Sequence, residues 1–202
     1  MDGVLVHSNS IHETAYRTAL AEIGVNRFNY DEIAGVRTDE AMGLILAASQ
    51  IVLPPESFRK LIARKRDLAI AAVSERDLMP ECRNVISLLA AKIKIGLATS
   101  ASRRLLERFL DLSQTRGKFL ATVSGEDVRA GKPHPEIFQR CATILGETAE
   151  QCLVVEDSQS GIEAAAAGGF RVLLFQSLQP IKKERIPIVG EIQNLSEIES
   201  YL

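Results

Sequence analysis

The chain has 202 residues, of which 46% are hydrophobic, and its formal net charge at pH 7 is −2. This length is enough for one hydrophobic core with a smaller appended domain. The near balance of charges excludes the strongly basic surface of a typical nucleic-acid-binding or membrane-docking protein. We therefore expect a small molecule as the partner, no nucleic acid or membrane, and a monomer by default.

The three cysteines are widely separated and lie mostly among apolar residues; they are Cys82, Cys141 and Cys152. This pattern predicts reduced core thiols and not a disulfide framework or a metal cluster. The sequence has no cationic segment followed by a long apolar run and no uninterrupted apolar stretch of about 18 residues. We expect a soluble, cytoplasmic protein.

At the start of the chain, a short apolar run between Met1 and Ser8 includes the carboxylate of Asp2 and a glycine, Gly3. A parallel α/β sheet places its chemistry at the carboxyl ends of its strands. Asp2 and Gly3 are typical of a loop at such a strand end, although the strand expected before them is missing from the sequence.

From about Ile11 to Val73 the apolar residues recur at helical spacing. Breaks fall at Gly24, at Gly35 and at the adjacent prolines 54 and 55, which do not continue a helix. This stretch predicts a small all-helical unit.

After residue 80 short apolar runs alternate with amphipathic helices. The predicted strands are Ile93 to Thr99, Phe119 to Val123, Leu153 to Val155 and Val172 to Phe175. Strands separated by helices indicate βαβ units and a doubly wound parallel sheet. We therefore predict an α/β core made of residues 1–8 and 80–202, with residues 9–79 inserted as a helical cap.

The predicted strand Ile93 to Thr99 ends in hydroxyl groups. Thr99 and Ser100 stand ahead of a helix that starts near Arg103. The free N–H groups and the dipole of a helix N-terminus favour an anionic oxygen. An ordinary N-cap is the alternative interpretation, since Ser and Thr are preferred there in any case.

A lysine, Lys132, lies between Gly131 and Pro133 ahead of a predicted helix. A lone surface lysine is usually only solvated, but these neighbours fix its backbone. The position suits a point charge directed at a phosphate.

Two adjacent carboxylates, Glu156 and Asp157, end the strand that starts near Cys152. They repel each other unless a cation or N–H donors offset their charge, and their oxygens suit Mg²⁺. The alternative is that Asp157 and Ser158 only cap the next helix.

Together these strand-end residues resemble the haloacid dehalogenase superfamily, and in particular its phosphatase and β-phosphoglucomutase-like branch, which has a helical cap inserted after the first motif. The matching segments cover almost the whole chain: Asp2-Gly3-Val4-Leu5, Leu97-Ala98-Thr99-Ser100, Gly131-Lys132-Pro133 and Val155-Glu156-Asp157-Ser158.

The resemblance implies a role for each matching residue. Asp2 would be the general acid/base, Thr99 with the backbone of Ser100 would bind the transferring phosphoryl group, and Lys132 would neutralise the phosphate charge.

The resemblance also implies a metal site. Asp157, assisted by Glu156, would hold Mg²⁺, and the backbone carbonyl of Asp2 would reach the same ion.

In the cap, the resemblance places His12 near the hinge and Arg37 with Thr38 on a loop that faces the active site. Arg37 is expected to contact a distal anionic group of the substrate, because its charge is fixed and its donors are forked. The alternatives are a solvated arginine and a surface histidine.

The attacking aspartate that the resemblance implies would stand two residues before Asp2, and Met1 occupies the intervening position. We expect either a start assigned at an internal methionine, which we favour, or a non-catalytic relative. As to function, we expect a Mg²⁺-dependent phosphatase on a small phosphorylated metabolite such as a sugar phosphate. The alternatives are a sugar-phosphate mutase and a binding module without chemistry.

Overall fold

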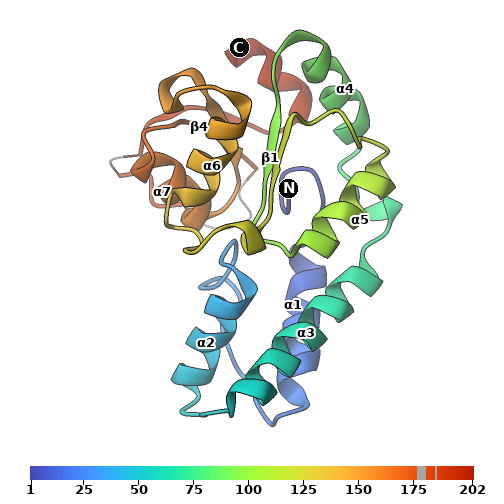
Figure 1. Cartoon of the computed structure of the whole chain (residues 1–202), viewed down its shortest axis with the longest axis vertical. Helices are drawn as coiled ribbons and strands as arrows, with labels where there is room; N and C mark the ends of the chain where they lie inside the picture. Colours follow the sequence, from blue (N-terminus) through green and yellow to red (C-terminus); the bar gives the residue numbers. More distant parts are fainter. Residues whose placement is uncertain (177–180, 185) are drawn as a thin grey trace.

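The computed structural model describes residues 1–176, 181–184 and 186–202. It has two parts, an α/β part above and a helical part below (Figure 1). The helical part contains α1 (Asn9–Ala21), α2 (Thr38–Ala48) and α3 (Pro55–Ala72). These helices lie in the stretch where the apolar spacing predicted a helical unit.

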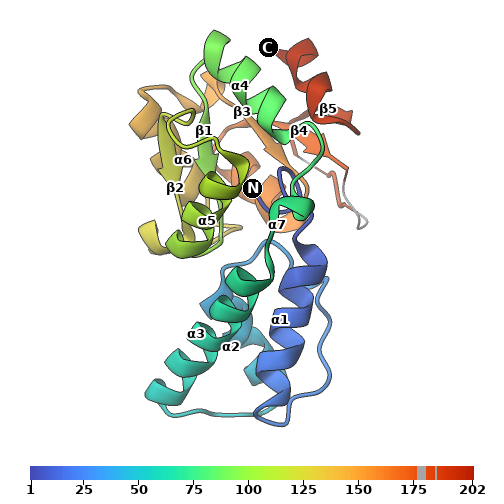
Figure 2. The same cartoon turned by 90° about the vertical axis from the view of Figure 1, so that its right-hand side faces the viewer.

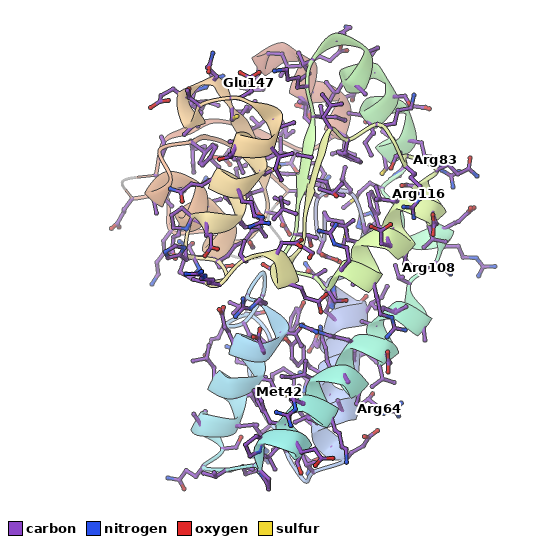
Figure 3. The ribbon with its side chains drawn as sticks, in the orientation of Figure 1. Met42, Arg64, Arg83, Arg108, Arg116 and Glu147 are labelled. Atoms are coloured by element: carbon purple, nitrogen blue, oxygen red, sulfur yellow. The ribbon has the colours of Figure 1, made fainter. Side chains whose placement is uncertain are left out.

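The helical part has its own hydrophobic core. Leu20 and Met42 are fully buried and Tyr16 is 3% exposed. Figure 3 shows Met42 inside this part, whereas Arg64 points outward from α3. The core explains why these helices are stable as a unit, since amphipathic helices of this length depend on tertiary packing.

The α/β part follows in the order α4 (Cys82–Lys92), β1 (Gly96–Ala98), α5 (Arg103–Ser113), β2 (Ala121–Val123), α6 (Glu136–Leu145), β3 (Leu153–Glu156), α7 (Gln159–Ala167), β4 (Arg171–Phe175) and β5 (Ile188–Ile192). Short 3₁₀ helices lie at Glu75–Asp77, Gly125–Asp127, Ala149–Gln151 and Leu195–Tyr201.

All the strand pairs are parallel, which confirms the predicted α/β class. β1 pairs with β2, and β3 pairs with β4, which pairs with β5. The first two predicted strands are shorter in the structure than in the prediction, and β5 was not predicted. Its sequence, Ile-Val-Gly-Glu-Ile, has a glycine and a glutamate in place of a clear apolar alternation.

Both faces of the sheets are covered by helices. On β4, Val172 and Leu174 pack in the cluster that contains residues of α6 and α7, while Leu173 and Phe175 pack in the cluster that contains residues of α4 and α5. Successive side chains of a strand point to opposite faces, so β4 supplies both cores. Figures 1 and 2 show these helix pairs on the two sides of the strands.

A gap separates the two sheets. Between β1 and β3 lies a slot of about 600 Å³, lined mainly by apolar side chains such as Leu5, Leu89 and Val155. The first residues do not fill it as a strand, because the carbonyl of Met1 accepts a hydrogen bond from the N–H of Leu5 at 2.8 Å and closes a tight turn. Residues 1–8 therefore contribute a turn and not a paired strand to the core.

No helix of the described residues is both long enough and apolar enough to cross a membrane. The three cysteines are free thiols, and two of them, Cys82 and Cys141, are buried.

Candidate active site

The residues predicted for catalysis meet at one end of the sheets. Asp2, Thr99, Lys132 and Asp157 all line a cavity of about 80 Å³ between the α/β part and the helical part. Thr99 directly follows β1 and Asp157 directly follows β3. The carboxyl ends of the parallel strands therefore bring together groups that are far apart in the sequence.

The Asp2 carboxylate is held by three side chains. Its Oδ1 accepts hydrogen bonds from Ser8 Oγ at 2.8 Å and from His12 Nε2 at 3.1 Å, and its Oδ2 accepts one from Thr99 Oγ1 at 2.9 Å. Burial acts to raise the pKa of Asp2, but the hydrogen bonds and charge of its neighbours outweigh it and hold the pKa far below its usual range. Asp2 is therefore ionised at neutral pH.

A buried lysine of the helical part supports this carboxylate through His12. Lys65 Nζ lies 2.9 Å from His12 Nδ1 and 4.2 Å from the centre of the Tyr16 ring. Burial and the Lys65 charge lower the pKa of His12, so the neutral ring accepts from Lys65 and donates to Asp2. Burial lowers the pKa of Lys65 to about 7, because the attraction of Asp2 only partly offsets it.

Sequence analysis missed Lys65. It lies on a helix rich in charged residues, where a lysine normally faces solvent, yet its exposed fraction is 3%. Only the packing of α3 against α1 places it beside His12, and the sequence carries no motif for that contact.

Thr99 is 2% exposed and its hydroxyl also accepts a hydrogen bond from the N–H of Ala101 at 3.1 Å. The N-cap of α5 is Ser102, whose side chain accepts from the N–H of Leu105. Thr99 is therefore not the N-cap of α5, and its hydroxyl is turned toward Asp2 in the cavity. The Ser100 hydroxyl donates to the carbonyl of Gly35 at 2.7 Å, so only its backbone is left for a ligand.

The Lys132 ammonium is 4% exposed and forms an ion pair with Glu156. Its Nζ also lies 4.8 Å from the centre of the Phe138 ring. Each of two buried opposite charges in contact would be strongly unfavourable without its partner. Burial acts to raise the pKa of Glu156, and the charge and hydrogen bond of Lys132 lower it overall.

Both carboxylate oxygens of Glu156 have partners within the protein. Its Oε1 contacts Lys132, and its Oε2 accepts from the N–H groups of Asp157 and Ser158 and from the Ser158 hydroxyl. Ser158, and not Asp157, is the N-cap of α7. The contacts of Glu156 hold Lys132 and the start of α7, and its assignment as a metal ligand stays a prediction.

Asp157 lies against the turn at Gly3. A Cβ atom at Gly3 would fall 1.7 Å from Asp157 Oδ2, so only glycine is compatible with this approach. Burial, together with the Glu156 charge, raises the pKa of Asp157 to about 7. A divalent cation would offset the crowding of these carboxylates. The described side chains contain no cluster of three His, Cys, Asp or Glu residues that could hold a metal by themselves.

Arg37 does not line this cavity among the described residues, although Thr38 and His12 do. The Arg37 guanidinium crosses to the α/β part and donates to the carbonyl of Val128 at 2.9 Å. The expected contact with a substrate anion is not made in this geometry, because the arginine binds the protein itself.

Several further bonds join the two parts around the cavity. Ser160 Oγ donates to the Ala34 carbonyl at 3.1 Å, and Arg66 pairs with Glu126 at 2.6 Å. The N–H of Gly131 donates to Glu40 at 2.9 Å. The helical part therefore closes the strand-end cavity.

Comparisons with known proteins agree with this geometry. The chain is 31% identical to hexitol phosphatase B of Escherichia coli (strain K12), over 98% of this chain and 91% of that protein. It is 32% identical to the phosphorylated carbohydrates phosphatase of Thermotoga maritima, over 84% and 79% of the two chains.

Among solved structures, β-phosphoglucomutase of Clostridium difficile superposes with a TM-score of 0.83 at 20% identity, over 98% of this chain and 89% of that one. This match shows the fold alone. The family model for haloacid dehalogenase-like hydrolases matches residues 1–169. The chain therefore belongs to the haloacid dehalogenase-like hydrolase family.

Proposed function

We propose that the chain is a Mg²⁺-dependent phosphatase that acts on a small phosphorylated metabolite such as a sugar phosphate. One observation carries the proposal: Asp2, Thr99, Lys132 and Asp157 line one cavity at the strand ends. They supply a proton-transfer group, a hydroxyl donor, a fixed cation and a carboxylate for a metal ion, which phosphoryl transfer requires. The names of the two phosphatases above support a phosphorylated carbohydrate as substrate.

In this proposal the phosphoryl group lies between Thr99 and Lys132. When phosphate binds, the Thr99 hydroxyl donates to one of its oxygens in place of Asp2 Oδ2, and the N–H of Ser100 donates to another near the start of α5. Lys132 Nζ neutralises its charge, and the ion pair with Glu156 holds this ammonium in place. Because Lys132 is buried, its field is screened little by solvent.

Asp2 transfers the proton. The carboxylate is ionised, and its hydrogen bonds from Ser8 and His12 fix its orientation. A phosphate bound beside it would raise its pKa, so that Asp2 could hold the proton and deliver it to the leaving oxygen.

Asp157 is the side chain that would hold Mg²⁺, with the backbone carbonyl of Asp2 nearby. The fit rests on its buried carboxylate and raised pKa, because a cation removes the repulsion from Glu156. When bound, the ion would supply charge neutralisation for the phosphate oxygens.

The proposal includes the division into a core of residues 1–8 and 80–202 and a cap of residues 9–79. The hydrogen bonds of Ala34, Gly35 and Glu40 with the α/β part support it, because they enclose the cavity. The monomeric state and the cytoplasmic location stay predictions from the composition.

Isothermal titration with inorganic phosphate, with and without Mg²⁺, tests the proposal on the 202-residue chain. We expect phosphate binding that Mg²⁺ strengthens, and Asp157→Asn should remove the effect of Mg²⁺. Asp67→Asn is the matched control, because this carboxylate is 54% exposed on the cap. Absence of phosphate binding, or an unchanged Mg²⁺ effect in Asp157→Asn, would contradict the proposal.

A further inference from the structure

Every nitrogen of the Arg37 guanidinium already has an acceptor in the protein. Nε donates to Asp39 Oδ1 at 2.7 Å, and the two terminal nitrogens reach the Val128 carbonyl at 2.9 Å and Glu40 Oε1 at 3.1 Å. The side chain is only 14% exposed. We call Arg37, Asp39 and Glu40 the arginine clasp.

Both Arg37 and Glu40 of the clasp form hydrogen bonds with the α/β part. Arg37 also contacts the carbonyls of Gly125 and Arg129, and Glu40 accepts from the N–H of Gly131. A ligand that needed Arg37 would have to break these bonds, and the arginine would leave Asp39 and the carbonyl of Val128 without this donor. The clasp therefore keeps Arg37 from acting as an anion receptor.

The rest of the cap wall of the cavity offers mainly neutral groups. Asn9, Tyr16, Tyr30 and Thr38 bring amide and hydroxyl groups, and Ile33 and Val36 bring apolar surface.

Lys65 is the one cation among the described cap residues that line the cavity, apart from the titratable His12. Its Nζ is directed at His12 and lies over the Tyr16 ring. It supports the Asp2 carboxylate at the phosphoryl end of the cavity and not the far end of a substrate.

A substrate held between Thr99 and Lys132 therefore meets a charged core and a neutral cap. A hydroxylated remainder finds hydrogen-bond partners on that wall. A second phosphate would lose its water there without gaining a free cation, and an unpaired buried anion is strongly unfavourable.

We propose that the cap selects phosphate monoesters whose remaining part is neutral and hydroxylated, a polyol or sugar monophosphate, and rejects a second phosphate because the arginine clasp withholds Arg37. The inference rests on the proposed phosphate site. It favours a phosphatase over a mutase that passes through a bisphosphate, since a bisphosphate requires a cationic site at each end.

Calorimetric titration of the 202-residue chain in Mg²⁺ tests this inference with three ligands: inorganic phosphate, sorbitol 6-phosphate and glucose 1,6-bisphosphate. We expect the monophosphate to bind at least about tenfold more tightly than the bisphosphate. Asp39→Ala removes the acceptor of Arg37 Nε, which leaves this donor free for an anion, and should reduce the ratio several-fold; adding Arg37→Met to it should restore the ratio. Glu56→Ala is the control, because this cap carboxylate is 70% exposed and lies at the start of α3, at the opposite end of the helix from residue 72.

The outcomes separate the two proposals. If inorganic phosphate does not bind, the proposed function fails, and this inference fails with it. If phosphate binds but the bisphosphate binds as tightly as the monophosphate, this inference alone is overturned. The same holds if Asp39→Ala and Glu56→Ala give the same ratio.

Discussion

The two hollow regions of this protein differ in chemistry. The cavity between core and cap measures about 80 Å³ and contains Asp2, Lys132 and Asp157, whereas the slot between β1 and β3 measures about 600 Å³ and is mainly apolar. Nearly every charged group in the first has a partner within hydrogen-bond distance. In the slot, the edges of β1 and β3 face each other, and no strand of the described residues lies between them.

This difference shows that the binding groups keep their positions even though the strands that carry them belong to two separate sheets. Thr99 stands at the end of β1 and is held by its hydrogen bond with Asp2, and Asp157 follows Glu156, which pairs with Lys132. The polar cavity is assembled although β1 and β3 belong to two separate sheets, with the slot between them.

The largest effect is expected from added residues that fill the slot and end in a carboxylate at the cavity. We predict that a chain extended before Met1 by about five apolar residues and an aspartate gains turnover of p-nitrophenyl phosphate by about 10³-fold or more, because a carboxylate then stands two positions before Asp2. The matched control ends the same extension in asparagine. Equal rates for the two extensions would remove the carboxylate from the mechanism.

The same extensions should stabilise the fold. A strand that pairs with both β1 and β3 buries apolar side chains in the slot, and the gain in free energy of unfolding should be a few kcal/mol after the cost of ordering. For a chain of this size we expect the midpoint of thermal unfolding to rise by about 5–10 °C. Calorimetry should give this rise with aspartate or asparagine and not with a polar, proline-containing extension.

Removal of the cation in the polar cavity should cost a similar amount. Lys132→Ala leaves Glu156, which is 6% exposed, as a buried charge without its partner. We expect the free energy of unfolding to fall by about 3–5 kcal/mol, measured by urea denaturation. The double change Lys132→Met with Glu156→Gln should recover most of this loss, and a loss as large in the double variant would contradict the ion-pair explanation.

The smallest expected effect is the pH dependence set by Lys65. Its pKa is lowered from 10.5 to about 7 in the folded chain, so between these values the unfolded chain binds more protons. The free energy of unfolding therefore rises as pH rises from about 7 toward 10, and it falls again as pH is lowered through this range. Urea denaturation at several pH values should show a smaller rise for Lys65→Met than for the original chain.

Much of the active site could be predicted because Thr99 and Asp157 stand at strand ends and Lys132 stands in a turn between a glycine and a proline. Thr99, Lys132 and Asp157 follow short apolar runs or rigid turns, and the parallel topology brings such positions together. The order of helices and strands followed from the spacing of apolar residues in the same way.

What could not be predicted depends on contacts between distant segments. Lys65 is recognised only when α1 and α3 pack, and the fate of Arg37 depends on carbonyls about 90 residues away in the sequence. The sequence predicts Glu156 as a metal ligand. It does not show that Lys132 and the N–H groups at the start of α7 contact its two oxygens. Sequence spacing fixes where a side chain starts, and tertiary packing decides what it binds.

A crystal structure of the chain with Mg²⁺ and phosphate would test the central claim most directly. We predict that the phosphate lies within hydrogen-bond distance of Thr99 Oγ1 and Lys132 Nζ, with the ion bound by Asp157. A phosphate bound elsewhere, or an ion held by Glu156 in place of Asp157, would contradict the account.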